Sequence, residues 1–219
     1  MRFRFTALFS AVALPALTAM AAPAALTVTV ENMTDGAPIP ARHALCKATT
    51  DGKSTGGENI RPDIGWSGAP IGTKSYAIIV KDPDVPADFT DAGKEGKTVA
   101  AQAKRQLFYH WAVTDIPATV SSIAGGDAKT PPAVGIQHLN SLGDYVPTPA
   151  QYGGPCPPWN DARVHRYHFT VMALDVASLK LDKTTPASDV EKAIATHVLA
   201  RGTITGTYTL NPALMPKAH

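Results

Sequence analysis

The sequence has little charge and few cysteines, and each scarcity excludes a class of protein. Charged residues make up 17% of the 219 positions, against roughly 25% in an average soluble domain. The 20 basic residues barely exceed the 18 acidic ones and are scattered, which excludes the clustered basic surface of a nucleic-acid-binding protein. Two cysteines cannot make a disulfide-dense mini-protein, and an apolar content of 44% argues against disorder.

Standard catalytic signatures are missing as well. The stretch GWSGA at residues 65–69 is not the G-x-S-x-G nucleophile elbow, and the H-E-x-x-H, P-loop and G-x-G-x-x-G patterns do not occur. The absence of C-x-x-C excludes a thioredoxin-like redox motif and a zinc ribbon. We therefore expect a protein that is not an enzyme and that uses no cofactor.

The first 24 residues have the pattern of a cleaved export signal. Arg2 and Arg4 precede an apolar stretch that ends at Met20, and small residues follow at the spacing of a cleavage site. A membrane anchor is the alternative, but a proline interrupts the stretch and spanning needs about 20 apolar residues. We expect residues 1–24 to be removed, leaving residues 25–219 as a single, formally neutral domain that is periplasmic or secreted and not inserted in the membrane.

Export also bears on the two cysteines. In an oxidising compartment, an even pair far apart in the sequence is typical of one long-range disulfide, here between Cys46 and Cys156. Two free buried thiols are the alternative.

Alternating hydrophobicity predicts a mainly β chain. Leu26–Val30 has the pattern of an edge strand, and Ser75–Val80 that of a buried strand. This buried strand is expected to end before residues 82–86 (DPDVP), because two prolines this close do not fit a central strand. Residues 107–115 and 165–174 alternate as two further strands.

One clear helix is predicted near the C-terminus. Residues 188–191 (SDVE) have the pattern of a capping box, and an apolar stripe follows at Val190, Ile194 and Val198. Gly202 stands where a helix would end, before a last strand over residues 203–210.

Four polar side chains stand out because they lie in strands or at strand ends near loops rich in proline and glycine. They are Asp82, His110, His165 and Tyr167. Such positions are candidates for a shared pocket, although a residue of this kind taken alone more often has a structural role. A metal site of Asp82, His110 and His165 is chemically allowed, but no short ligand spacing supports it, and we expect none.

Several short motifs occur in an order that points to one family. They are GENIRP (57–62), Trp66, GTKS (72–75), DPDVP (82–86), YHW (109–111), GGPCPP (153–158) and HRYHFTVMALD (165–175). Together they resemble the phosphatidylethanolamine-binding protein family, in its bacterial Raf-kinase-inhibitor-like branch, over about residues 26–212.

This resemblance implies an antiparallel β-sandwich with a C-terminal helix and peripheral short helices. It also implies a small pocket that binds an anion through Asp82, His110, His165 and Tyr167, with a wall at Pro157 and Pro158 and Pro86 at the rim. Asp84 and Arg166 are expected to hold the loops by hydrogen bonds and a salt bridge. Two imidazoles and a phenol can donate hydrogen bonds to phosphate or carboxylate oxygens, and Asp82 can raise the pKa of an imidazole.

The sequence departs from the family pattern at Arg61, Gly153 and Cys156, and at residues 87–106, a polar segment longer than the usual connection. Part of this segment, residues 98–106, has the composition for two helical turns. Exported relatives tend to pair a cysteine in the early loop with one in the proline turn, which supports the Cys46–Cys156 bridge.

We therefore expect an exported protein that binds a phosphorylated or carboxylated ligand, such as a phospholipid head group. An inhibitor or interaction module, using residues 87–106 to capture a protein partner of the envelope or the host, is one alternative. A weak hydrolase is another, and a homodimer is compatible with each.

Overall fold

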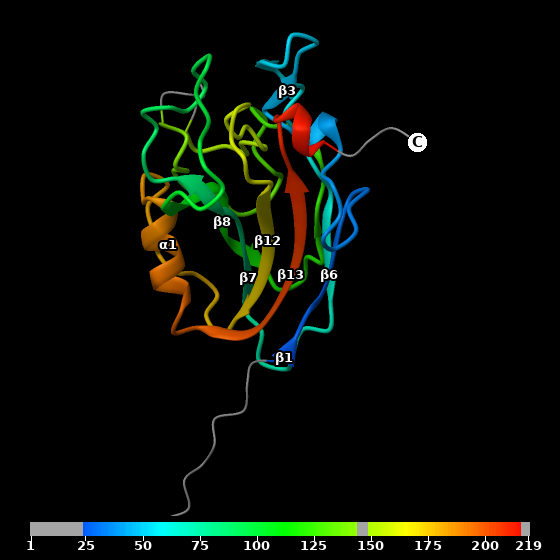
Figure 1. Cartoon of the computed structure of the whole chain (residues 1–219). Coiled ribbons are helices and arrows are strands. Elements are labelled where there is room, and N and C mark those ends of the chain that lie inside the picture. Colours follow the sequence, from blue (N-terminus) through cyan, green and yellow to red (C-terminus); the bar gives the residue numbers. More distant parts are fainter. Residues whose placement is uncertain (1–23, 144–148, 216–219) are drawn as a thin grey trace, which may run out of the picture.

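The computed structural model describes residues 24–143 and 149–215, which form a β-sandwich with one α-helix (Figure 1). The predicted export signal lies almost wholly outside the described residues. Among those residues, no helix combines the length and the apolar character needed to cross a bilayer.

A six-stranded sheet forms the larger layer of the sandwich. Its strand order is β1-β13-β12-β7-β8-β11, and all neighbours are antiparallel except β1 and β13. The strands are β1 (Ala24–Ala25), β7 (Ser75–Pro86), β8 (Arg105–Pro117), β11 (Ile136–Gln137), β12 (His165–Leu174) and β13 (Val198–Tyr208).

Both faces of this sheet are covered. On one face lies a second sheet, of β2 (Thr27–Val30), β6 (Ile64–Ser67) and β9 (Ser122–Ile123), and the core between the layers contains Trp111 and Phe169. Helix α1 (Ala187–Ile194) packs on the opposite face through Val190 and Ile194. Burial on both faces explains why Ser75–Val80 is continuously apolar instead of alternating.

The remaining elements are short. The pairs β3 (Cys46–Ala48) with β4 (Ser54–Gly56), and β5 (Ile60–Arg61) with β10 (Gly126–Asp127), form two small ladders. Among the described residues, the 3-10 helices η1 (Ala41–His43) and η3 (Pro212–Leu214) lie at the periphery. The mainly β fold with a C-terminal helix is as predicted.

The predicted end of the buried strand at residue 80 is wrong, because β7 continues through both prolines to Pro86. The pairing of β7 with β12 ends at Lys81, so the DPDVP stretch pairs only with β8. The register with β8 also shifts between Asp82 and Val85. A strand that is paired on one side and irregular in register tolerates residues without a backbone N–H.

The predicted helix is real, but its ends differ. It begins after Pro186, so Ser188 lies inside the first turn and makes no cap. It ends at Ile194, and Gly202 lies within β13, where a Cβ atom would stand 2.3 Å from the Leu26 carbonyl oxygen. Gly202 therefore permits the close approach of two strands. The helical turns predicted over residues 98–106 are absent, and β8 begins there instead.

Candidate functional site

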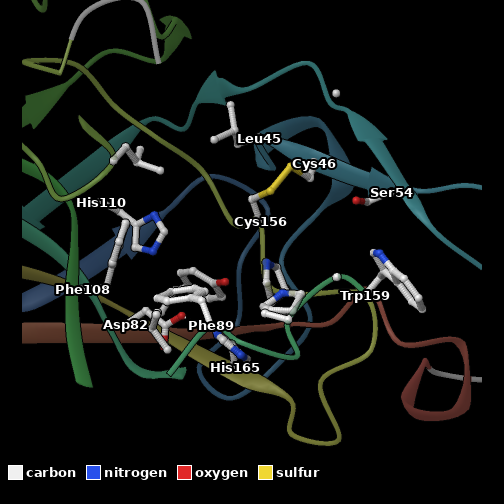
Figure 2. A pocket seen from close by; sticks show the side chains of 18 residues that line it. Leu45, Cys46, Ser54, Asp82, Phe89, Phe108, His110, Cys156, Trp159 and His165 are labelled. Atoms are coloured by element: carbon white, nitrogen blue, oxygen red, sulfur yellow. Dashed lines mark hydrogen bonds and ion pairs between the residues drawn. A yellow bond between two sulfur atoms is a disulfide. The ribbon is translucent and has the colours of Figure 1, made fainter. Parts of the chain in front are cut away.

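A cavity of about 610 Å³ opens where β7, β8 and β12 meet two loops (Figure 2). Six of the seven predicted ligand-binding residues line it, namely Asp82, His110, Pro157, Pro158, His165 and Tyr167. Pro86 is not among the lining residues, whereas its neighbour Val85 is. In Figure 2, His110, Phe108 and Asp82 lie on one side of the cavity and Ser54 and Trp159 on the other.

Strand geometry explains why distant residues converge here. Asp82 is paired with Phe108 across β7 and β8, and His110 lies two residues further along β8. His165 and Tyr167 point inward from the start of β12, where alternate residues share one face. Four polar groups from three strands thus meet at one end of the sandwich.

The imidazole of His165 bridges two carboxylates. Its Nδ1 lies 2.6 Å from Oδ2 of Asp82, and its Nε2 lies 3.1 Å from Oδ2 of Asp161. All three side chains are only 1% exposed. Burial alone would lower the pKa of His165, but the hydrogen bonds with Asp161 and Asp82 outweigh it and raise this pKa to about 9. His165 is therefore an imidazolium at neutral pH, and both N–H groups are committed to the protein.

Arg105 completes this cluster. Its guanidinium donates to both oxygens of Asp161, at 2.5 Å and 3.0 Å, and its side chain is almost fully buried. Burial would raise the pKa of Asp161, but His165 and Arg105 hold it below its usual value. Two carboxylates (Asp82 and Asp161) and two cations (His165 and Arg105) leave the cluster with no net charge, as buried charges require.

His110, in contrast to His165, is a neutral imidazole. Its Nδ1 donates to the Gly153 carbonyl oxygen at 2.7 Å, so in the neutral ring Nε2 carries a lone pair. This Nε2 is buried and has no hydrogen-bond partner among the described residues. Burial lowers the pKa of His110, with the positive charge of His165 acting in the same direction and the carboxylate of Asp82 against it. His110 therefore presents a neutral ring with an unsatisfied nitrogen at the cavity.

Tyr167 lies between the two histidines. Its ring centroid is 5.0 Å from that of His110, edge to face, and 6.4 Å from that of His165, stacked. Burial, and then the Asp82 carboxylate, raises the pKa of this phenol well above its ordinary value. Tyr167 consequently keeps its proton at any physiological pH and remains a hydrogen-bond donor.

Asp84 braces the chain beside the cavity. Arg166 donates to its two oxygens at 2.7 Å and 2.9 Å, and Arg163 donates to one of them at 3.2 Å. Burial would raise the pKa of Asp84, but the Arg166 guanidinium outweighs this effect and lowers it. The ion pair that the resemblance implied between Asp84 and Arg166 is therefore present, outside the cavity.

The cysteines form the predicted bridge. Cys46 and Cys156 are joined by a disulfide, and both line the cavity (Figure 2). The link ties the β3–β4 hairpin to the proline turn. The turn also packs closely on the chain before the hairpin, because a Cβ on Gly154 would stand 1.9 Å from the His43 carbonyl oxygen.

The other departures from the family pattern have local explanations. Arg61 is buried, donates to the carbonyl oxygens of Ala124 and Thr130, and lies over the Trp111 ring. It fills a structural position outside the cavity. Gly153 supplies the carbonyl that fixes the His110 tautomer. Residues 87–106 contribute Phe89, Ala92 and Gly93 to the lining.

Sequence reasoning missed Asp161 and Arg105. Asp161 lies in an irregular turn, where no periodicity marks a side chain as inward-facing. Arg105 lies in a polar segment that composition assigns to solvent. In the part of the chain that the structure describes, no three His, Cys, Asp or Glu side chains are arranged to hold a metal ion.

Comparison with known families is consistent with this geometry. Residues 29–209 match the family model described as phosphatidylethanolamine-binding protein. An Aquifex aeolicus protein, named only as a UPF0098 protein, is 37% identical over 153 residues, which cover 69% of this chain and 75% of the relative. The UPF0098 protein YbcL of Escherichia coli K12 is 31% identical over 198 residues, 89% of this chain and 93% of the relative.

Two solved structures have a similar fold. The crystal structure of Escherichia coli YbcL, titled a new member of the mammalian PEBP family, superposes with a TM-score of 0.65 and 28% identity, covering 85% of this chain and 99% of the other. A Chlamydia trachomatis structure, titled a putative phosphatidylethanolamine-binding protein homolog, gives a TM-score of 0.61 and 29% identity, with 84% and 97% coverage.

Proposed function

The chain belongs to the phosphatidylethanolamine-binding protein family, and from this premise we propose that it is an exported protein that binds a small phosphate- or carboxylate-bearing ligand without cleaving it. The observation that carries the proposal is the buried, unpartnered Nε2 of His110, which lies at the cavity. An unsatisfied buried polar atom in a concave site calls for a ligand group that completes its hydrogen bonding.

The neighbouring charges favour a ligand held by hydrogen bonds. The cluster of Asp82, His165, Asp161 and Arg105 is neutral as a whole, so it neither attracts nor repels an anion strongly. Because both N–H groups of His165 are engaged and the Tyr167 hydroxyl interacts with Asp82, His110 is the side chain with a free polar atom for the ligand. The family resemblance gave His165 the role of a direct donor. We now assign it to holding Asp82 in place.

Binding of an anion is expected to take up a proton. The free His110 is neutral at pH 7 because burial lowers its pKa, and an anion at Nε2 favours the imidazolium. A phosphate monoester has a second pKa near 6, so its monoanion can also bring the proton itself. Either route predicts that affinity rises as the pH falls from about 8 to about 6, by up to about tenfold per pH unit.

Titration calorimetry with inorganic phosphate, phosphoethanolamine and acetate at several pH values tests this proposal. In His110→Asn we expect both the binding and its pH dependence to be lost. His168→Gln is the matched control, because His168 lies on the outer face of β12, where its Nδ1 contacts Thr205, and it does not line the cavity. Unchanged affinity in His110→Asn, or no binding of any of these anions by the wild type, would overturn the proposal.

Export is the second part of the proposal, and it is supported by the N-terminal sequence pattern and by the disulfide. A disulfide persists in an oxidising compartment and is rare in the cytosol. Intact mass analysis of protein isolated from the periplasmic or extracellular fraction should show a chain that begins near residue 25 and resists thiol alkylation. Recovery of the full-length chain from the cytosol, with two alkylated thiols, would contradict export.

A further inference from the structure

The segment that joins β7 to β8, residues 87–104, is far longer than the roughly 2–5 residues of an ordinary hairpin loop. Its length and polar composition raised the alternative of a surface that captures a protein partner. The structure places three of its residues, Phe89, Ala92 and Gly93, in the lining of the cavity.

One buried side chain holds this segment in place. The amide nitrogen of Asn160 donates to the carbonyl oxygens of Asp91, Lys94 and Lys97, and its amide oxygen accepts from the backbone N–H of Gly93. Asn160 is 6% exposed. A single side chain thus satisfies four backbone groups of the segment, which closes the segment into a compact loop.

The far end of the loop is fixed as well. The backbone of Val99 exchanges hydrogen bonds with the turn, donating to Asn160 and accepting from Ala162, and Arg105 donates to the carbonyl oxygens of Ala100 and Ala103. Lys53 at the β3–β4 hairpin pairs with Glu95 on the loop. The loop is therefore joined to the turn that contains Pro157, Pro158 and Trp159, and it forms a wall of the cavity.

This wall is apolar. Phe89 is 49% exposed although it lines the cavity, and the neighbouring lining includes other large apolar side chains, namely Leu45, Val85, Phe108, Leu142 and Trp159. Figure 2 shows Phe89 and Phe108 on the same side as Asp82 and His110, with Trp159 across the cavity. Aromatic rings thus lie both beside the polar groups and across the cavity from them.

The size of the cavity favours a ligand larger than a bare anion. At about 610 Å³ it lies within the roughly 300–1,000 Å³ of sites for drug-sized ligands. Inorganic phosphate, with five heavy atoms, would contact His110 and leave the aromatic part of the cavity to water. Half-exposed aromatic rings beside an anion site gain most from a flat apolar group, which stacks with little loss of ligand freedom.

We propose that the ligand is a phosphate or carboxylate that carries a planar apolar group of about one aromatic ring, and that Phe89, held by the Asn160-anchored loop, determines this preference. The inference rests on the proposed function, because it takes His110 as the anion contact. In this proposal the 87–104 segment forms a rigid wall of the cavity that determines which ligands bind, and we call it the specificity wall.

Calorimetry with three probes tests it, namely inorganic phosphate, phenyl phosphate and n-hexyl phosphate. The wild type should bind phenyl phosphate at least about tenfold more tightly than inorganic phosphate, and more tightly than hexyl phosphate. Phe89→Ala should lose about tenfold for phenyl phosphate and change little for inorganic phosphate. The matched control is Leu107→Ala, because Leu107 is 42% exposed on the adjoining strand but does not line the cavity.

Each outcome is decisive. Equal affinity of Phe89→Ala and wild type for phenyl phosphate, with inorganic phosphate still bound, overturns the specificity wall and leaves the proposed function standing. Preference for hexyl phosphate overturns the planar group in favour of a flexible chain. Failure of the wild type to bind any probe overturns both proposals. Because Phe89 is half exposed, its replacement should preserve folding, and an unchanged Tm checks this.

Discussion

The doubly bridged imidazolium of His165 makes the stability of the protein fall as the solution becomes alkaline. In the unfolded chain this histidine loses its proton near its ordinary pKa of about 6.5. The folded protein holds the proton until about pH 9, because Asp161 and Asp82 face the two ring nitrogens. Below pH 6.5 both states are protonated and the stabilisation is fully present, whereas it is progressively lost as the pH rises from 6.5 through 9.

The size of this effect follows from the pKa shift. A rise from 6.5 to about 9 corresponds to about 3 kcal/mol of folding free energy. Because the unfolded imidazole is already partly deprotonated at pH 7, about 2 kcal/mol falls between pH 7 and 9. The pKa values of His110 and His138 are lowered by burial, so their contributions change below this window.

Urea unfolding at pH 7 and pH 9, followed by tryptophan fluorescence without reductant, measures the loss. His165→Gln keeps an amide donor but cannot titrate, so its stability should fall by about 2 kcal/mol less than that of the wild type over this interval. His197→Gln serves as the control, because His197 is partly exposed and its imidazole contacts Asp175, away from the cluster, and it should keep the wild-type slope. Identical slopes in the wild type and His165→Gln would refute the protonated bridge.

Three further predictions concern the walls of the site. Replacing Cys46 and Cys156 by serine should cost about 2–5 kcal/mol of unfolding free energy, because the bridge closes a loop of 110 residues; a matching urea midpoint in the oxidised wild type and the double variant would contradict this. Arg105→Met should lower stability by about 3–5 kcal/mol, measured at pH 7, since it leaves buried Asp161 without its guanidinium partner; a loss below about 1 kcal/mol would argue against the buried pair. Gly154→Ala should weaken phosphate binding and lower the Tm, because its Cβ would stand 1.9 Å from a backbone carbonyl oxygen, and an unchanged crystal structure of that variant would show the contact to be wrong.

The site residues that lie in regular strands could be predicted from the sequence. Alternation over residues 165–174 predicted a strand, and β12 has the same bounds, with His165 and Tyr167 both buried. The motif order predicted that Asp82 and His110 would meet them, which requires only that β7, β8 and β12 be neighbours. The disulfide was also predictable, from compartment and cysteine count.

What could not be predicted depends on contacts between irregular segments. The hydrogen bonds of Asn160 and Asp161 connect a turn to a loop, and neither segment has a period from which a direction can be derived. The predicted capping box does not form for a related reason. Glu191 accepts hydrogen bonds from Lys81 and Tyr109 on the sheet, and the local sequence does not predict these distant partners. The protonation states of His110 and His165 differ through burial and partners, which composition does not encode.

The position of β12 in the middle of the sheet has a consequence for how the chain acquires its structure. β7 and β8 form a hairpin from neighbouring parts of the chain, but the strand that completes the centre, β12, begins only at residue 165. Contacts over such sequence distances make folding slow, since loop-closure entropy must be overcome before they form. Until β12 has been synthesised, the strand that carries His165 and Tyr167 is missing, and the cavity around Asp82 and His110 cannot form. A chain that completes its core late stays unfolded for longer, which would suit the proposed export, because a polypeptide is threaded through an export channel unfolded.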